Sequence, residues 1–367
     1  MGIIFANMHD ETLPAVTRLR TMASVPVAAR YRMIDFQLSS MTNAGIDTIG
    51  VVVKQNYRSL MDHLGTGREW DLGRKIGGLT LFPPQAELAH GDTYKGRLGA
   101  LYEILPYLVD AKAEYVVMAD CDFMCTPDYE AIIAFHEAKG ADVTMVCRKL
   151  DADTALPAEN VTVTCDAEGR VSQILSDDTS DGEHLQCMNM FVIAREKLIG
   201  YIRAGHSRQQ NHFVRHVLMN HTDEIKTCAY VYDDYASQIT SIHSYYETNM
   251  SLLNADNLND LFDSEPIYTK VRDSAPTRYA MDAKVSESLI ADGCILEGTV
   301  ENSVLFRGVQ IKKGAVVRNS ILMQDTVVEE GACVDCVITD KNVTVSAGKS
   351  VSGSKEYPVY VEKHVKV

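Results

Sequence analysis

The sequence has no glycine between Gly2 and Gly45, although residues 2–6 read as a short buried strand. In nucleotide-binding α/β proteins, such a strand runs into a glycine-rich loop whose backbone N–H groups hold phosphate. Here it runs into polar and acidic residues, from Asn7 to Glu11. The sequence therefore lacks a phosphate-binding loop at the place where this kind of fold provides one.

Several other features are absent. No apolar run is long enough for a membrane span, and the N-terminus has no signal-peptide pattern, so we expect a cytoplasmic protein. With 35 basic against 50 acidic residues, the formal net charge of −15 argues against nucleic acid as a partner, because a phosphate backbone requires a basic surface. The nine cysteines are scattered and odd in number, which favours reduced thiols over a disulfide framework.

The first part of the chain alternates short apolar runs with helical patterns. Runs at 46–53, 115–120 and 142–147 read as strands, whereas 97–110 and 129–141 read as helices. This alternation predicts a Rossmann-like α/β domain, with a mostly parallel sheet and helices on both faces. Ligands of such sheets bind beyond the carboxyl ends of the strands.

After about residue 280 the apolar period changes to six. Small and branched residues recur along one series: Val309, Ala315, Ile321, Val327 and Cys333. A hexapeptide repeat predicts a left-handed parallel β-helix in which each hexad forms one side of a triangular coil. The 367 residues are enough for two domains. We expect an α/β domain over 1–262, a linker over 263–280 and the β-helix over 281–367.

Four stretches carry a more specific signal. They are RYRMIDFQLSSMTNAGIDTIGV at 30–51, YKG at 94–96, YYETNMSLL at 245–253, and the hexad segment at 288–332. Together they resemble ADP-glucose pyrophosphorylase, the glucose-1-phosphate adenylyltransferase family, over nearly the whole chain. The resemblance implies a nucleotidyltransferase domain joined to a β-helix. Catalytic members of the family make ADP-glucose from ATP and glucose 1-phosphate for glycogen or starch synthesis.

The resemblance also identifies phosphate-binding groups that this chain lacks. The family's Gly-Gly-x-Gly-x-Arg-Leu loop is replaced by residues 7–12. A family lysine falls on Met22, a glycine pair falls on Ala28-Ala29, and the sugar-phosphate lysine falls on Asp177. His212 stands in place of the aspartate of an Asp-Phe-Gly motif. Transfer between two anions needs such groups to neutralise phosphate charge, so we expect catalysis to be lost.

The implied metal site is also incomplete. Of the two family carboxylates that hold the metal, one matches Asp122 and the other falls on Gln238. An amide does not balance a divalent cation as a carboxylate does, so we predict no metal site and treat Asp122 as vestigial. Gln55, Tyr94 and Gly96 match nucleotide- or sugar-binding positions and remain as remnants. This pattern resembles the regulatory, GlgD-type subunits of the family.

Three arginines lie close together in the sequence of this acidic chain. Arg20 and Arg32 match positions of the family's activator site, and Arg30 stands in place of a lysine. Guanidinium groups suit bidentate binding of phosphate or sulfate, so we expect an effector site for an anion. The alternative is that these arginines pair with nearby carboxylates: Asp10, Glu11 or Asp35.

The leading hypothesis is therefore a regulatory, catalytically degenerate subunit that acts in ADP-glucose and glycogen synthesis. We expect it to form homo-oligomers and mixed tetramers with a catalytic homologue, and to need no cofactor, with Mg²⁺ relevant only to residual catalysis. One alternative is a self-sufficient adenylyltransferase whose basic groups have moved, to Arg97 or Arg74. Another is a sugar-nucleotide-binding sensor without a catalytic partner.

Overall fold

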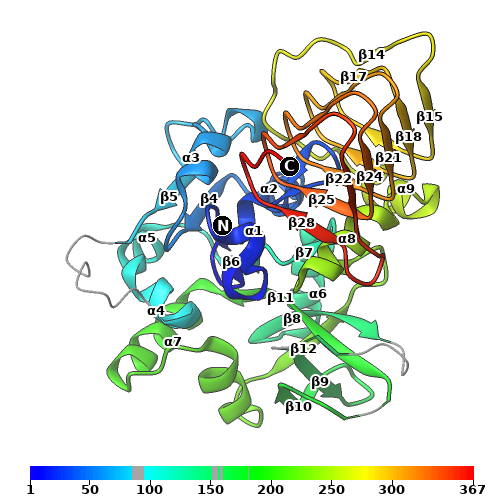
Figure 1. Ribbon diagram of the computed structural model, residues 1–367. Coiled ribbons are helices and arrows are strands. Elements are labelled where there is room, and N and C mark those ends of the chain that lie inside the picture. The colour runs from blue at the N-terminus through cyan, green and yellow to red at the C-terminus, as the bar shows by residue number, and fades with distance from the viewer. Residues whose placement is uncertain (85–94, 151–155, 158–159, 181) are drawn as a thin grey trace.

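The computed structural model describes residues 1–84, 95–150, 156–157, 160–180 and 182–367. It has an α/β domain followed by a stack of β-coils (Figure 1). The central nine-stranded sheet has the order β10-β9-β11-β6-β1-β4-β5, and β8 joins β11 to β12. Its strands are β1 (Gly2–Phe5), β4 (Thr48–Val52), β5 (Gly78–Phe82), β6 (Tyr115–Asp120), β8 (Val143–Leu150), β9 (Val161–Cys165), β10 (Val171–Ser176), β11 (His184–Ala194) and β12 (Thr227–Val231).

The sheet is parallel where the sequence alternates strands and helices. β1 pairs in parallel with β4 and β6, and β4 pairs in parallel with β5. The long strand β11 runs antiparallel to β6, β8 and β9. The predicted Rossmann-like architecture is therefore confirmed, and the strand-rich stretch after residue 160 adds the antiparallel part.

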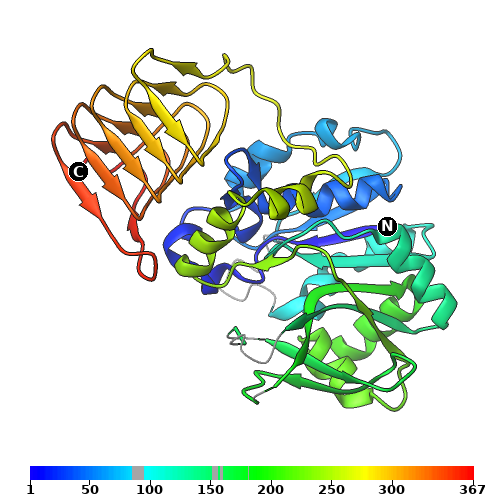
Figure 2. The same cartoon turned by 90° about the vertical axis from the view of Figure 1, so that its right-hand side faces the viewer.

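Helices cover both faces of this sheet (Figure 2). Side chains alternate along β1, so that Ile4 joins one apolar core, whereas Ile3 and Phe5 join the other. The first core contains residues of α2 (Met33–Asn43), α3 (Arg58–Leu64), α6 (Tyr129–Lys139), α8 (Ile242–Ser251) and α9 (Ala255–Phe262). The second contains residues of α4 (Gly96–Glu103), α5 (Leu105–Asp110) and α7 (Arg195–Ser207).

One predicted helix is two. The pattern at 97–110 predicts a single helix, but the structure ends α4 at Glu103 and begins α5 at Leu105. Pro106 explains the break, since its ring fixes φ, lacks an N–H group and clashes with the preceding turn. The helical spacing of apolar residues therefore continues from α4 into α5, although the helix itself is interrupted between them.

The C-terminal coils form three parallel sheets of five strands each. The first sheet contains β14 (Arg278–Tyr279), β17 (Ile295–Leu296), β20 (Gln310–Ile311), β23 (Val327–Val328) and β26 (Thr344–Val345). The second contains β15 (Lys284–Ser286), β18 (Thr299–Glu301), β21 (Val316–Arg318), β24 (Cys333–Asp335) and β27 (Ser350–Ser352). The third contains β16 (Leu289–Ile290), β19 (Val304–Leu305), β22 (Ile321–Leu322), β25 (Val337–Thr339) and β28 (Val359–Val361).

The two middle coils are slightly shorter than three hexads. Val300 pairs with Val317, and Val317 with Val334, so these coils advance by 17 residues. Val317, Leu322, Val328 and Val334 of one coil all belong to the apolar core inside the β-helix. The hexapeptide prediction is therefore right for two sides of the coil, whereas the side between Val317 and Leu322 is one residue shorter.

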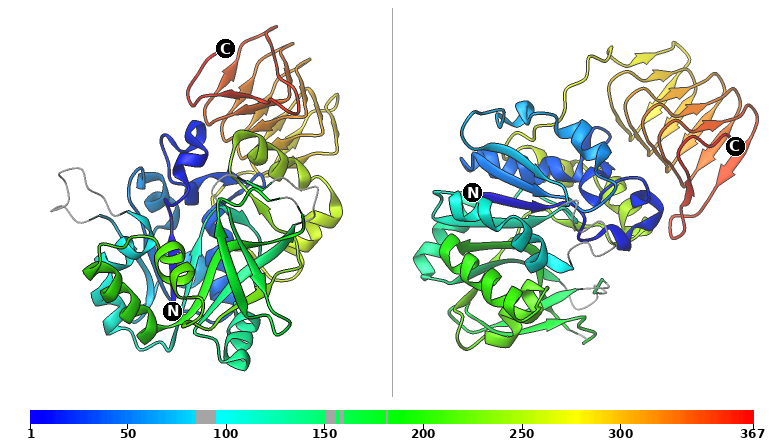
Figure 3. Two further views of the ribbon diagram at one scale, coloured as in Figure 1. Left: turned by 90° about the horizontal axis from the view of Figure 1, so that it is seen from below. Right: turned by 90° about the vertical axis from the view of Figure 1, so that its left-hand side faces the viewer.

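The third sheet of the β-helix packs against the α/β domain. Its residues Val304, Ile321 and Ile338 belong to the same apolar core as α2 and α8. Figure 3 shows the stack of coils resting on one end of the α/β domain. No helix or strand occurs between Phe262 and Arg278, although every residue there is described. Among the described residues, no helix has the length and apolar character needed to cross a membrane.

Candidate functional site

A cavity of about 520 Å³ opens at the carboxyl ends of β1 and β4, beside the N-terminus of α4. Ligand sites of open α/β sheets lie at this edge. Its lining includes Asn7, His9, Asp10, Lys54, Gln55, Gly96, Arg97, Asp177, Asn189, His212 and Arg215. The cavity is thus where the sequence analysis expects nucleotide and sugar phosphate to bind.

The loop after β1 is held by its own acidic residue. Asp10 accepts hydrogen bonds from Asn7 Nδ2 at 2.5 Å and from the backbone N–H of Met22 at 2.7 Å. Burial raises the pKa of Asp10 to about 6, although both hydrogen bonds oppose this rise. Met22, at the position of a family lysine, is itself buried in the first core. A carboxylate therefore organises the loop where the family has glycines.

Ala28 and Ala29, where the resemblance implies a glycine pair, have a backbone conformation that favours glycine. Ala28 and Ala29 have φ values of 49° and 60°, in the left-handed region that glycine adopts most easily. The backbone N–H of Ala28 donates to Asn249 Oδ1 at 3.0 Å. This hydrogen bond to Asn249 helps to hold the turn, although both of its residues carry a Cβ atom.

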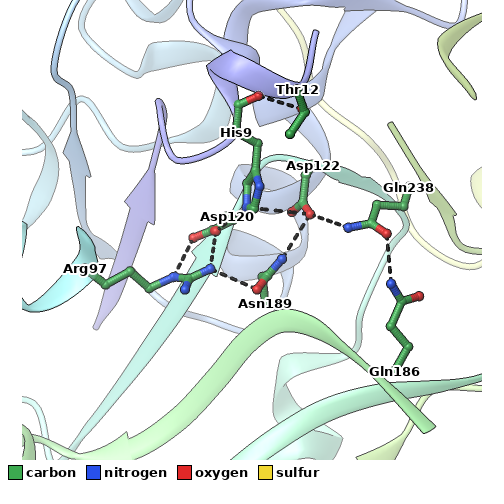
Figure 4. A network of polar contacts seen from close by, with 8 residues as sticks. All are labelled: His9, Thr12, Arg97, Asp120, Asp122, Gln186, Asn189 and Gln238. Carbon is green, nitrogen blue, oxygen red and sulfur yellow. Dashed lines mark hydrogen bonds and ion pairs between the residues drawn. The ribbon is translucent and has the colours of Figure 1, made fainter. Parts of the chain in front are cut away.

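Two buried carboxylates at the end of β6 face cationic side chains (Figure 4). His9 Nε2 lies 2.7 Å from Asp120 Oδ2 and 3.7 Å from Asp122 Oδ2. Arg97, in the first turn of α4, donates through Nε to Asp120 Oδ1 at 3.1 Å and through Nη2 to Asp120 Oδ2. The two carboxylates therefore have an imidazole and a guanidinium as direct neighbours.

Charge pairing shifts the pKa values of this group. Burial disfavours the imidazolium of His9, but the carboxylates of Asp122 and Asp120 outweigh it and raise the pKa of His9 to about 9. Burial likewise disfavours the charged form of Asp120, but Arg97 and His9 hold the pKa of that carboxyl below its usual value. The protein thus carries positive charge next to both aspartates at neutral pH.

Two amides complete the surroundings of Asp122. Asn189 Nδ2 donates to Asp122 Oδ2 at 3.0 Å, and Gln238 Nε2 donates to the same oxygen at 2.9 Å. Asn189 follows Met188 at a register shift of β11 and has a φ of 58°. Such a bulge turns a side chain out of the regular strand pattern. Gln238 comes from β13 (Ser237–Gln238), which pairs with β7 (Phe123–Met124).

The structure places most of the predicted remnants around the cavity. Gln55 and Gly96 line it, and Asp122 contacts Gln238 as the resemblance implies for the two metal positions. A Cβ on Gly96, whose φ is 68°, would lie 2.4 Å from the carbonyl oxygen of Asn211, so this position requires glycine. Tyr94 lies outside the described residues. The position of Asp177 on the cavity wall puts a negative charge where the family has a lysine.

The three arginines of the predicted effector site have different surroundings. Arg20 is buried and donates through Nη2 to both carboxylate oxygens of Asp340 in the β-helix, at 2.6 and 2.7 Å. Arg32 is also buried and donates to the carbonyl oxygen and hydroxyl of Ser59. Arg30 is exposed and lines a different pocket. The partner of Arg20 is therefore none of the nearby carboxylates named as the alternative.

A lysine that sequence analysis missed lies beside Arg20 and Arg32. Burial and the charges of Arg32 and Arg20 lower the pKa of Lys341 to about 7. Arg272 contributes in the same direction, whereas Asp340 opposes it. Positive charge is therefore concentrated where the α/β domain meets the last coils.

Comparison with known proteins agrees with this architecture. Residues 2–254 match the family model for nucleotidyl transferases, and residues 274–357 match that for the GlmU-like C-terminal hexapeptide. The glycogen biosynthesis protein GlgD of Bacillus subtilis (strain 168) is 35% identical over 364 residues, covering 99% of this chain and 95% of that protein. GlgD of Geobacillus stearothermophilus is 38% identical over 318 residues, or 86% and 82% of the two chains. A glucose-1-phosphate adenylyltransferase of Geobacillus stearothermophilus is 31% identical over 322 residues, or 87% and 83%.

Proposed function

The chain belongs to the nucleotidyl transferase family, among the GlgD glycogen biosynthesis proteins and the glucose-1-phosphate adenylyltransferases, and from this premise we propose its function. It is a regulatory, catalytically degenerate subunit of glucose-1-phosphate adenylyltransferase that acts in ADP-glucose and glycogen synthesis. It requires no cofactor of its own.

The observation that carries this proposal is that Arg97 and His9, the cationic groups beside Asp120 and Asp122, are paired with the protein's own carboxylates. Nucleotidyl transfer to a sugar phosphate brings two anions together, so positive charge must be available to meet them. Arg97 lines the cavity, but its guanidinium is bound to Asp120 and Asn189. His9 is bound to Asp120 and lies close to Asp122. These cationic groups serve the protein's own carboxylates.

The alternative of a self-sufficient enzyme requires Arg97 or Arg74 to replace the lost phosphate ligands. Arg97 is engaged as just described. Arg74 is exposed at a different pocket, where it contacts Asp71 at 2.5 Å and Asp47 at 3.3 Å. Neither arginine therefore takes the place of a loop that cradles a triphosphate, and the regulatory role is favoured.

The proposal includes a catalytic homologue as partner, in mixed tetramers, and homo-oligomers when the chain is alone. The open end of the β-helix supports it, because β14, β15 and β16 each pair with one neighbouring strand in their sheets. Tyr279 and Met281 are exposed at this end. Unpaired strand edges with apolar side chains are surfaces on which another chain packs.

The proposal also includes an anionic, phosphate-bearing effector at the junction of the two domains. Its support is Arg32, which has no carboxylate ion pair among the described residues, and Lys341 near it; Arg20 lies there too, but its guanidinium is paired with Asp340. Arg30 lies apart from this cluster at another pocket. An ion bound at the junction contacts both domains and so favours one of their arrangements over another.

The experiment that tests the function is an assay of ADP-glucose synthesis by the catalytic homologue with increasing amounts of this protein. The proposal predicts a saturable change in kcat, KM or effector response, together with co-elution of the two proteins in gel filtration. An equal amount of an unrelated acidic protein is the control. Unchanged kinetics with separate elution would contradict the proposal.

A further inference from the structure

The resemblance to the family implies a divalent metal held by two carboxylates, and the residues at this place do not fit one. Asp122 is present, but its Oδ2 accepts N–H groups from Asn189 and Gln238, at 3.0 and 2.9 Å. Mg²⁺ and Mn²⁺ need oxygen ligands whose lone pairs point at the ion. Here N–H groups point at the carboxylate from two sides.

The direction of the Gln238 amide is fixed by an arginine. Arg148 Nε donates to Gln186 Oε1 at 2.9 Å, so Gln186 presents its Nε2 to Gln238 Oε1, also at 2.9 Å. Gln238 is thereby left with its NH₂ group facing Asp122. A guanidinium only donates hydrogen bonds, so flipping either amide would bring two donors or two acceptors together. The relay holds an N–H donor against Asp122.

A second relay fixes the Asn189 amide. Arg97 Nη2 donates to Asn189 Oδ1 at 2.9 Å, which leaves Asn189 Nδ2 for Asp122. Arg97 also donates to both oxygens of Asp120, and His9 Nε2 lies 2.7 Å from one of them. Asp122 Oδ1 is the buried oxygen of the pair without a hydrogen-bond partner among the described residues. Mg²⁺ is usually held by one or two carboxylates together with waters, and here the other three carboxylate oxygens of Asp120 and Asp122 already accept N–H groups.

We propose that these two arginine-fixed relays, with His9, close the Asp120–Asp122 pair to divalent cations. Arg97 then supplies, as part of the chain, positive charge directly beside Asp120. The proposal rests on the proposed function, since it explains how a site of this family is stable without a metal. His9 Nε2 and the carboxylate oxygens of Asp120 and Asp122 lie within 4.8 Å of one another, so exclusion depends on the N–H groups rather than on distance.

The test uses Mn²⁺ alone as a probe, with binding followed by electron paramagnetic resonance of the full chain. The wild type should show no saturable binding up to about 1 mM, the weak limit of carboxylate sites. Gln238→Glu is nearly isosteric and replaces the NH₂ donor by an acceptor, while Gln186 still donates to the new side chain. It should bind one Mn²⁺ at least tenfold more tightly than the wild type.

Two controls make the result specific. Gln173→Glu adds the same charge on an exposed part of β10 and should leave Mn²⁺ binding unchanged. Asp122→Asn, added to Gln238→Glu, should remove the gained site. Saturable binding by the wild type that Asp122→Asn abolishes would overturn the proposal. So would a folded Gln238→Glu variant without any gain. No substrate or partner enters this measurement, so its failure is distinct from a failed mixing assay.

Discussion

Asp122 shows which contacts of a single residue could be predicted from the sequence and which could not. Its proximity to Gln238 follows from sequence, because both positions lie in segments that resemble family motifs, and the structure joins them at 2.9 Å. The contacts of His9 and Arg97 with Asp120 were not predictable. They unite residues separated by 111 and 23 positions, and they depend on the directions of individual side chains. The signal that was present is a second aspartate two residues before Asp122.

Gln209 offers a test of backbone strain at one residue. It follows α7 with a φ of 57° and is exposed, and its N–H closes the end of the helix on His206. Gly140 ends α6 in the same way, with a φ of 53° and open space around its Cα. Gln209→Gly should raise the free energy of unfolding by about 0.5–1 kcal/mol, and Gly140→Ala should lower it by about 1 kcal/mol. Thermal unfolding measures both, and equal signs for the two changes would contradict the argument.

Lys341 makes the proposed effector site dependent on pH. Its pKa of about 7 is low because of burial and of Arg32 and Arg20, with Arg272 adding to the effect and Asp340 opposing it. A bound anion favours the charged lysine and must raise this pKa. Affinity for the anion should therefore be highest below pH 7 and fall as the pH rises through 7 toward 9.

Sulfate is the suitable probe, because its charge does not change over this range. Calorimetry should show roughly tenfold weaker sulfate binding at pH 9 than at pH 6, which corresponds to a rise of about one unit in the pKa of the lysine on binding. Lys341→Met should bind weakly and without this dependence. Equal affinity of the wild type at both values would refute the assignment of Lys341.

At the scale of elements, the loop between β1 and α2 connects the cavity to the β-helix. Its first half lines the cavity through His9 and Asp10. Two arginines further along, Arg18 and Arg20, pair with Glu362 and Asp340 of the last coils. This loop thus contacts both the cavity and the β-helix.

We expect these two ion pairs to contribute very differently to the free energy of unfolding. The side chains of Arg20 and Asp340 are each 4% exposed, whereas those of Arg18 and Glu362 are more than half exposed. Arg20→Met should cost about 3–5 kcal/mol, because it leaves a buried carboxylate unpaired. Arg18→Met should cost less than about 1 kcal/mol.

Thermal unfolding of the two variants measures this contrast. Adding Asp340→Asn to Arg20→Met should recover part of the loss, because the unpaired charge is then removed. Similar unfolding temperatures for Arg18→Met and Arg20→Met would show that the buried pair does not hold the loop on the β-helix.

The elements themselves were largely predictable, for physical reasons that also explain the errors. Alternating apolar periods indicated the strands and helices of the sheet, because each period places apolar side chains on one face. The break at Pro106 is a local event within a continuing apolar pattern. The 17-residue coil was missed because the hexad count follows two sides of the triangle and continues across the third.

On the scale of the whole molecule, one apolar core continues from the α/β domain into the β-helix. Tyr246 of α8 adds a hydrogen bond to the carbonyl oxygen of Asn319, at 2.7 Å. The third sheet is therefore occupied by the chain's own domain, whereas the first strands of the stack, β14, β15 and β16, each pair with a single neighbouring strand.

Assembly through this end is testable with one substitution. Met281 is fully exposed near β14, so Met281→Glu should weaken homo-oligomers and mixed complexes by placing charge in an apolar contact. Val109→Glu, on the exposed side of α5, is the matched control and should leave assembly unchanged. Sedimentation velocity reports both. A wild-type monomer that does not associate with the catalytic homologue would contradict the proposed assembly.

The central claim is that this site has lost catalysis because its charges are paired within the protein. The measurement that tests it most directly is ADP-glucose synthesis by the isolated protein, with ATP, glucose 1-phosphate and Mg²⁺. Removal of several phosphate-stabilising groups, each worth about 10²–10³ in rate, predicts turnover at or below the detection limit. Turnover within tenfold of the catalytic homologue would contradict the claim.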